Sequence, residues 1–192
     1  MITILALGDS LTAGYGLGPG MSFASRLEKA LTEEGWEVSV INGGISGDTT
    51  LDGLRRLDGL LRLRPDLVLV ELGPNDFFME LPLREIRTNL DQIISACLES
   101  NARVLLAGFE SLQGYYPGYD EDFHKIYREI ASSRQVPLCP DFLPGIPQNP
   151  ELTLPDGVHP NDAGTQKIVE HILPAVKKEL KKILTRAVPV TQ

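Results

Sequence analysis

The sequence is poor in cysteine. Only Cys97 and Cys139 occur among its 192 residues, too few for the disulfide framework that stabilises small extracellular domains. We interpret both as small buried hydrophobic residues. A chain of this length buries enough surface to fold without disulfides or a structural metal. We therefore expect residues 1–192 to form a single domain.

Long apolar runs and an excess of positive charge are also absent. No apolar run approaches the roughly 18–20 residues of a membrane span, so stable membrane insertion is not expected. The formal net charge is −8, and an acidic chain repels phosphate backbones, which excludes nucleic-acid binding by bulk electrostatics. No block of five like charges indicates an interaction tail.

The first residues lack the charges of a signal peptide. No Lys or Arg precedes Arg26, whereas a signal peptide begins with a positively charged region. Residues 1–7 instead have the pattern of a strand, and we expect a cytoplasmic protein. A chain beginning at the mature end of a periplasmic or secreted protein would have the same pattern.

Short apolar runs alternate with segments of helical periodicity. This alternation predicts a three-layer α/β/α sandwich around a five-stranded parallel sheet, with the flavodoxin-like strand order 2-1-3-4-5. The expected strands are residues 2–7, 38–41, 67–72, 104–107 and 136–138. The expected helices lie near residues 22–34, 51–61, 82–97, 123–130 and 161–184.

Ligands of such sheets bind beyond the carboxyl ends of the strands. Ser10 follows the first strand in Gly8-Asp9-Ser10, where a serine is exposed above the sheet and is a candidate nucleophile. It could equally be a turn or cap residue. The glycines that follow, up to Gly20, could form a phosphate-binding loop, although the loop lacks the Gly-Lys-Ser/Thr ending of an NTPase.

A nucleophilic serine needs a base, and the chain has three histidines. His124 follows the expected core residue Phe123 and should lean toward solvent, and His171 is expected to be exposed or at a rim. Only His159 lies in a loop at the expected active edge. Asp156 is three residues before it, close enough to accept a hydrogen bond from one ring nitrogen and leave the other for the serine proton.

Acyl transfer also needs hydrogen-bond donors for an oxyanion. Gly47 can bring a backbone N–H close to a ligand, and Asn75 offers a side-chain amide after the third strand. Each has an ordinary alternative role, as a turn glycine and a helix cap. Apolar side chains near these loops suit an acyl or aryl group, or pack as core beneath them: Phe77, Phe78, Met79, Leu112, Tyr115, Tyr116 and Val158.

Four motifs occur in order, each after a different strand: Gly8-Asp9-Ser10-Leu11, Gly47, Gly73-x-Asn75-Asp76 and Asp156-x-x-His159. Together they resemble the SGNH hydrolase family, also called GDSL lipases, and its thioesterase I, lysophospholipase and arylesterase branch. The resemblance implies Ser10 as nucleophile, His159 as base and Asp156 as its orienting partner. It implies an oxyanion hole of Ser10, Gly47 and Asn75. Pro74 departs from the glycine usual in that branch and should stiffen the Asn75 loop.

The expected function is therefore a serine ester hydrolase that forms an acyl-enzyme. Its expected substrates are short-to-medium acyl or aryl esters, with thioesters and lysophospholipids as further candidates. No metal or cofactor is expected, and the expected state is a monomer or weak homo-oligomer. The alternatives are a carbohydrate O-deacetylase of the same family, and a non-catalytic flavodoxin-like protein that binds phosphate or a nucleotide.

Overall fold

The computed structural model describes residues 1–187, which contain one parallel sheet. Its strand order is β2-β1-β3-β4-β5, which confirms the predicted order. Every residue of β3 is buried, as expected for a parallel strand covered on both faces. The strands are β1 (Ile2–Gly8), β2 (Val38–Gly44), β3 (Leu67–Glu71), β4 (Arg103–Ala107) and β5 (Leu138–Cys139).

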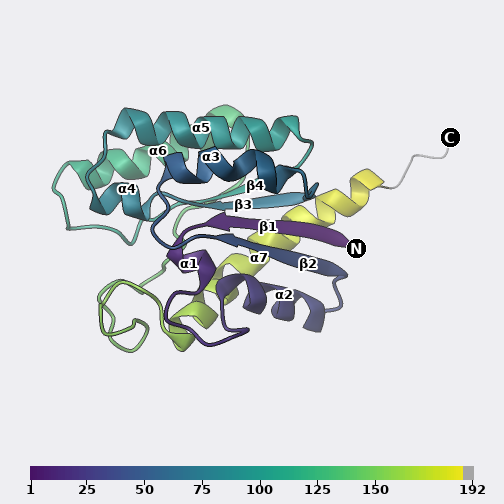
Figure 1. Ribbon diagram of the computed structural model, residues 1–192, viewed down its shortest axis with the longest axis horizontal. Coiled ribbons are helices and arrows are strands. Elements are labelled where there is room, and N and C mark those ends of the chain that lie inside the picture. The colour runs from purple at the N-terminus through teal and green to yellow at the C-terminus, as the bar shows by residue number, and fades with distance from the viewer. Residues whose placement is uncertain (188–192) are drawn as a thin grey trace.

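Helices cover both faces of the sheet, which confirms the three-layer sandwich (Figure 1). One layer contains α2 (Phe23–Glu33) and α7 (Asp162–Ala187), which pack against each other. The other contains α3 (Thr50–Leu61), α5 (Leu83–Glu99) and α6 (Tyr119–Arg134). None of these helices, within residues 1–187, is long and apolar enough to cross a membrane. Both cysteines are buried, as predicted.

Some boundaries differ from the prediction for physical reasons. Helix α6 begins at Tyr119, before the predicted start at residue 123. Its first turn is acidic, with Asp120, Glu121 and Asp122, and negative charge stabilises a helix N-terminus. Strand β5 is residues 138–139 and not 136–138, because Pro137 has no N–H to donate to the sheet.

Two short helices that the periodicity did not reveal begin at the carboxyl ends of neighbouring strands. Helix α1 (Ser10–Ala13) follows β1, and α4 (Pro74–Phe78) follows β3. Four or five residues are too few for a recognisable helical pattern. Because β1 and β3 are adjacent, these two helices bring Ser10 and Asn75 to the same edge of the sheet.

Candidate active site

The turn that carries Ser10 is fixed by a helix cap and by close packing at Gly8. Asp9 caps α1, and its side chain accepts a hydrogen bond of 2.9 Å from the backbone N–H of Leu11. Gly8 is required here, because a Cβ at this position would overlap the Thr12 hydroxyl and the Glu71 carboxyl. Ser10 opens the helix, so its backbone N–H lies in the first turn, where no intrahelical acceptor exists. This N–H is thus available to an anion above the turn.

The turn that carries His159 is fixed by its own backbone. One Asp156 carboxylate oxygen accepts hydrogen bonds of 2.9 Å from the N–H groups of both Val158 and His159. Gly157 makes the turn possible because its φ is +70°. The His159 carbonyl accepts a hydrogen bond of 2.8 Å from the N–H of Leu154. The backbone that carries the imidazole is therefore fixed by hydrogen bonds at both the N–H and the carbonyl of His159.

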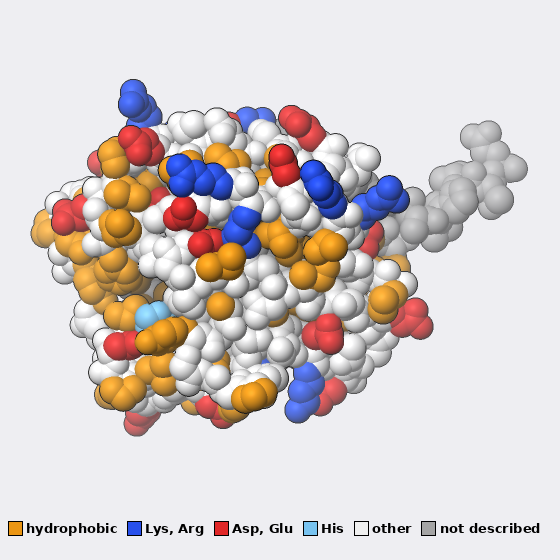
Figure 2. Space-filling model, in the orientation of Figure 1, with side chains coloured by type: hydrophobic (Ala, Val, Ile, Leu, Met, Phe, Trp, Pro, Cys, Tyr) orange, Lys and Arg blue, Asp and Glu red, His pale blue; other side chains and the backbone are white. Residues whose placement is uncertain are grey.

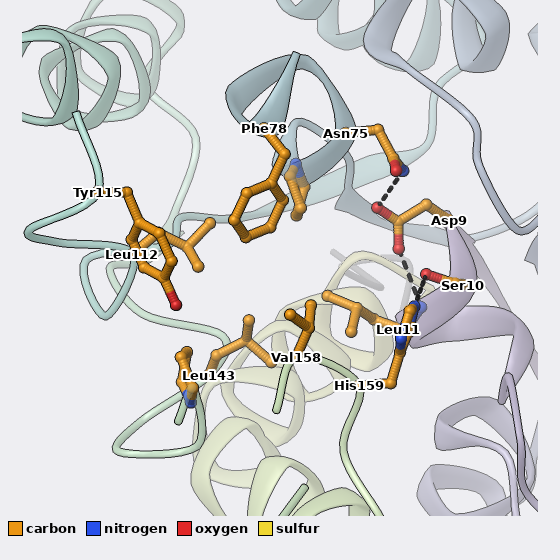
Figure 3. Close-up of a pocket in the computed structure, with 12 residues that line it drawn as sticks. Asp9, Ser10, Leu11, Asn75, Phe78, Leu112, Tyr115, Leu143, Val158 and His159 are labelled. Atoms are coloured by element: carbon orange, nitrogen blue, oxygen red, sulfur yellow. Dashed lines mark hydrogen bonds between the residues drawn. The ribbon is translucent and has the colours of Figure 1, made fainter. Parts of the chain in front are cut away.

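Ser10, His159 and Asp156 form a continuous hydrogen-bonded chain (Figure 3 shows its Ser10–His159 link). His159 Nδ1 lies 2.7 Å from the second oxygen of Asp156, and Nε2 lies 3.0 Å from Ser10 Oγ. Burial acts to raise the pKa of Asp156, but hydrogen bonds from Val158 and His159 hold it below its ordinary value. The carboxylate accepts a hydrogen bond from Nδ1–H, which keeps the ring proton on Nδ1 and leaves Nε2 as an acceptor for the serine proton.

An aromatic ring covers the imidazole. The ring centroid of Tyr15 lies 4.5 Å from that of His159, with the two planes tilted by 40°. Tyr15 is itself exposed, so it separates one face of the imidazole from bulk water. This contact could not be predicted from the sequence, because nothing in a glycine-rich loop indicates where its single aromatic side chain packs.

The side-chain amide of Asn75 lies between two acceptors. Its nitrogen donates to Asp9 Oδ2 at 3.0 Å and to the carbonyl oxygen of Asp48 at 2.9 Å. Asp48 belongs to the turn that contains Gly47, whose φ is +90° and whose Cβ position is open. The structure therefore connects Asn75 to the turn of Gly47, whereas Gly47 itself does not line the cavity beside Ser10.

Two carboxyl groups near Ser10, those of Asp9 and Glu71, are buried. Burial, with smaller effects of Asp48 and Asp76, raises the pKa of Asp9 to about 7. Burial and the neighbouring Asp9 raise the pKa of Glu71 well above its ordinary value. One Glu71 oxygen accepts hydrogen bonds from the Thr12 hydroxyl at 2.7 Å and from the Asp9 N–H at 3.3 Å. Within residues 1–187 the other oxygen is buried without a hydrogen-bond partner, which disfavours the charged form of the carboxyl.

These shifts predict how stability depends on pH. An acid whose pKa is raised on folding favours the folded state while protonated, so the free energy of unfolding should fall as pH rises above about 4.5. Glu71→Gln replaces the carboxyl with a neutral isostere, so we expect a flatter loss of stability between pH 5 and pH 9. Urea unfolding at pH 5, 7 and 9 measures it.

The matched control for this prediction is Glu99→Gln, because Glu99 is exposed at the end of α5. This control should keep the wild-type dependence on pH. A Glu71→Gln protein that loses stability with pH as steeply as the wild type would contradict the assignment.

A cavity of about 130 Å³ opens beside Ser10 and His159. Ser10 and His159 lie at one end of it, and Leu112 and Tyr115 lie at the opposite end (Figure 3). Figure 2 shows hydrophobic side chains gathered on this side of the molecule, at the left, beside a histidine. Four of the predicted apolar residues line the cavity, and further apolar side chains join them: Phe78, Leu112, Tyr115 and Val158, with Leu11, Pro74, Leu143 and Pro147.

Three predicted wall residues do not line this cavity. Phe77 is fully buried and packs against the rings of Tyr115 and Tyr116 with centroids 6.0 and 5.3 Å apart, so it belongs to the core beneath the loops. Met79 is 62% exposed and points away from the core. The Tyr116 hydroxyl donates to the Phe78 carbonyl at 3.2 Å. Consecutive residues at the end of α4 thus have different surroundings, since Phe77 is in the core, Phe78 lines the cavity and Met79 is exposed, which composition does not reveal.

The other two histidines lie outside the chain of Ser10. His171 is exposed, as predicted, but the prediction for His124 is wrong. His124 is buried, because the loop before α6 folds over it and its Nε2 lies 3.0 Å from the Leu112 carbonyl oxygen. Within residues 1–187, no cluster of three or more His, Cys, Asp or Glu side chains is arranged to hold a metal ion.

Comparison with known proteins agrees with this geometry. Residues 6–167 match the GDSL-like Lipase/Acylhydrolase family. The chain is 42% identical to an arylesterase of Vibrio mimicus over 178 residues, 92% of this chain and 89% of the relative. It is 39% identical to thioesterase 1/protease 1/lysophospholipase L1 of Escherichia coli strain K12 over 162 residues, 83% of this chain and 76% of the relative.

A solved structure has the same fold. The crystal structure of the psychrotrophic esterase EstA from Pseudoalteromonas sp., inhibited by monoethylphosphonate, superposes with a TM-score of 0.88 at 32% identity. The match covers 94% of this chain and 100% of that one. The family that the four motifs predicted is therefore confirmed, and the chain belongs to the GDSL-like lipase/acylhydrolase family.

Proposed function

We propose that this carboxylic ester hydrolase works through Ser10 as nucleophile, His159 as general base and Asp156 as the group that orients His159. The observation that supports this most strongly is the continuous chain from Asp156 Oδ2 through the imidazole to Ser10 Oγ, at 2.7 and 3.0 Å. Both separations lie within the range required of a nucleophile and its base.

The reaction then follows in two halves. Ser10 Oγ attacks the ester carbonyl carbon as His159 Nε2 takes the hydroxyl proton, and the C–O bond to the alcohol breaks as His159 returns that proton to the leaving oxygen. Water next attacks the acyl-Ser10 ester, again losing its proton to His159. The acid leaves when Ser10 regains the proton, and Asp156 stabilises the imidazolium in both halves.

The oxyanion is proposed to bind the backbone N–H groups of Ser10 and Gly47 and the amide of Asn75. Both Asn75 amide hydrogens already have protein acceptors, Asp9 and the Asp48 carbonyl. The amide must therefore share or exchange one of these bonds as negative charge develops on the substrate oxygen. The two acceptors hold the amide plane in place until that happens.

Replacing Asn75 tests this role. Asn75→Ala is expected to lower kcat about 10²–10³-fold, because one preorganised donor to the transition state is lost. KM should change much less, since the donor acts on the developing charge. Steady-state kinetics on p-nitrophenyl acetate measure both constants. A large rise in KM with kcat unchanged would identify Asn75 as a ground-state binding residue instead.

The cavity supports a short-to-medium acyl or aryl ester as substrate. An apolar cavity of about 150 Å³ holds a benzene molecule, and the cavity here measures about 130 Å³ with mostly apolar walls. The apolar lining favours an acyl or aryl group over the sugar of an O-deacetylase. The alternative of a flavodoxin-like phosphate binder leaves the Ser10–His159–Asp156 chain without a role. The predicted cytoplasmic location and monomeric or weakly oligomeric state stay predictions.

A substrate series tests the proposed function. p-Nitrophenyl esters from acetate to palmitate, acyl-CoA thioesters, a lysophospholipid and an acetylated sugar are assayed with the same enzyme preparation. The proposal expects the highest kcat/KM among acetate, butyrate and hexanoate. No hydrolysis of any ester, or activity only on acetylated sugars, would contradict it.

A further inference from the structure

Leu112 and Tyr115 lie at the end of the cavity away from Ser10 (Figure 3). We call these two side chains the far wall. Both belong to the connection between β4 and α6, which has no helix or strand of its own. A loop of this kind holds a cavity in one shape only if its backbone groups are tied to something rigid. The contacts of this loop therefore decide how well the far wall is defined.

One carboxylate accepts hydrogen bonds from three backbone N–H groups of this loop. Asp120, in the first turn of α6, accepts hydrogen bonds from the N–H groups of Gly114, Tyr115 and Tyr116 at 2.7, 3.2 and 2.9 Å. Asp120 is 9% exposed, so these bonds are largely shielded from water. Hydrogen bonds to an ionised acceptor are roughly twice as strong as neutral ones.

A second anchor lies one helical turn further along α6. His124 Nε2 donates to the Leu112 carbonyl oxygen at 3.0 Å, since a carbonyl oxygen can only accept. Burial lowers the pKa of His124, so the ring is neutral with its proton on Nε2. Asp120 and His124 are four residues apart and so lie on the same face of the helix. The helix thus holds the loop at both residues of the far wall.

Helix α4, which borders the cavity, and the loop after it are also hydrogen-bonded to the start of α6 and to the loop before it. The Tyr119 hydroxyl, at the start of α6, donates to the Leu81 carbonyl oxygen at 2.7 Å, and the Tyr116 hydroxyl donates to that of Phe78 at 3.2 Å. The Phe78 ring, which lines the cavity, packs edge-on against Tyr115 with centroids 5.5 Å apart. A displacement of the loop would therefore move Tyr115 and Phe78 together.

We propose that Asp120, supported by His124, is a positioning residue that sets the depth of the acyl cavity and thereby selects acyl-chain length. Neither residue lines the cavity, so both act through Leu112 and Tyr115. The inference depends on the proposed function, because it takes this cavity as the acyl site. A short acetyl group stays near Ser10, whereas a longer acyl chain reaches the far wall.

The test measures kcat and KM of Asp120→Asn for p-nitrophenyl acetate and p-nitrophenyl hexanoate. An amide has one accepting oxygen in place of two, so at least one loop N–H loses its partner. We expect KM for the hexanoate to rise about tenfold, the effect of losing contacts to roughly two methylene groups. The constants for acetate should stay within about twofold. Asp122→Asn is the control, because Asp122 is exposed in the same helical turn and pairs with Lys125.

A second pair of variants keeps the proposal testable if Asp120→Asn does not fold. His124→Gln retains an N–H donor for Leu112 and should behave more like the wild type than His124→Leu, whose KM for hexanoate should rise.

Equal ratios of hexanoate to acetate KM in folded Asp120→Asn, Asp122→Asn and wild type would overturn the inference, as would equal ratios in the two His124 variants. An equal loss on both esters would also overturn it. A wild type that hydrolyses neither ester would instead refute the proposed function.

Discussion

Ser10→Ala is expected to lower kcat for p-nitrophenyl acetate by at least about 10⁴-fold, which corresponds to about 5 kcal/mol of transition-state stabilisation. The reason is that no covalent intermediate forms without the hydroxyl. The fold should persist, because the Ser10 hydroxyl is hydrogen-bonded to His159 in a loop, while the backbone of α1 is capped by Asp9. Turnover is measured in parallel with circular dichroism and thermal unfolding.

The remaining activity of Ser10→Ala is also informative. Binding and the oxyanion donors still act, so a rate somewhat above the uncatalysed reaction is expected. Wild-type turnover by the purified, folded variant would show that the nucleophile lies elsewhere.

His159→Ala is the second replacement with a very large expected effect. Loss of the base should cost about as much as loss of the nucleophile, because the two residues act as one unit and their effects are not additive. The double variant Ser10→Ala/His159→Ala should therefore be scarcely slower than either single variant. Steady-state rates of all three on the same ester measure this.

The matched control is His171→Ala, because His171 is exposed on α7 and does not belong to the hydrogen-bonded chain of Ser10, His159 and Asp156. It should retain nearly all activity. A folded and active His159→Ala, or an inactive His171→Ala, would contradict the assignment of the base.

Much of the fold was predictable because its elements are long and strongly patterned. The apolar residues that open β3 are typical of a buried strand, and the repeated leucines of α3 are typical of an amphipathic helix. The short helices α1 and α4 escaped prediction, although they orient Ser10 and Asn75. Their formation depends on tertiary contacts, such as those of Asp9 and Glu71 beneath α1.

The candidate site was predictable where the residue type alone dictates the chemistry. A serine after the first strand, with a histidine and a nearby aspartate in a loop after the last strand, suggests acyl transfer. The cavity wall was not predictable in the same way. Leu143 and Pro147 come from the segment after β5, and nothing in the composition of that segment marks it as part of a cavity. The burial of His124 depends on a loop that folds back over α6, and such a contact leaves no periodic signal in the sequence.

The central claim is that Ser10 carries the acyl group during the reaction, and covalent labelling tests it most directly. The wild-type protein is incubated with a fluorophosphonate, which reacts with activated serines, and its intact mass and peptide map are recorded. We expect one adduct per chain, located on Ser10, with loss of esterase activity in proportion to labelling. The same treatment should leave Ser10→Ala unlabelled. An adduct on another residue, or full activity in a completely labelled protein, would contradict the mechanism.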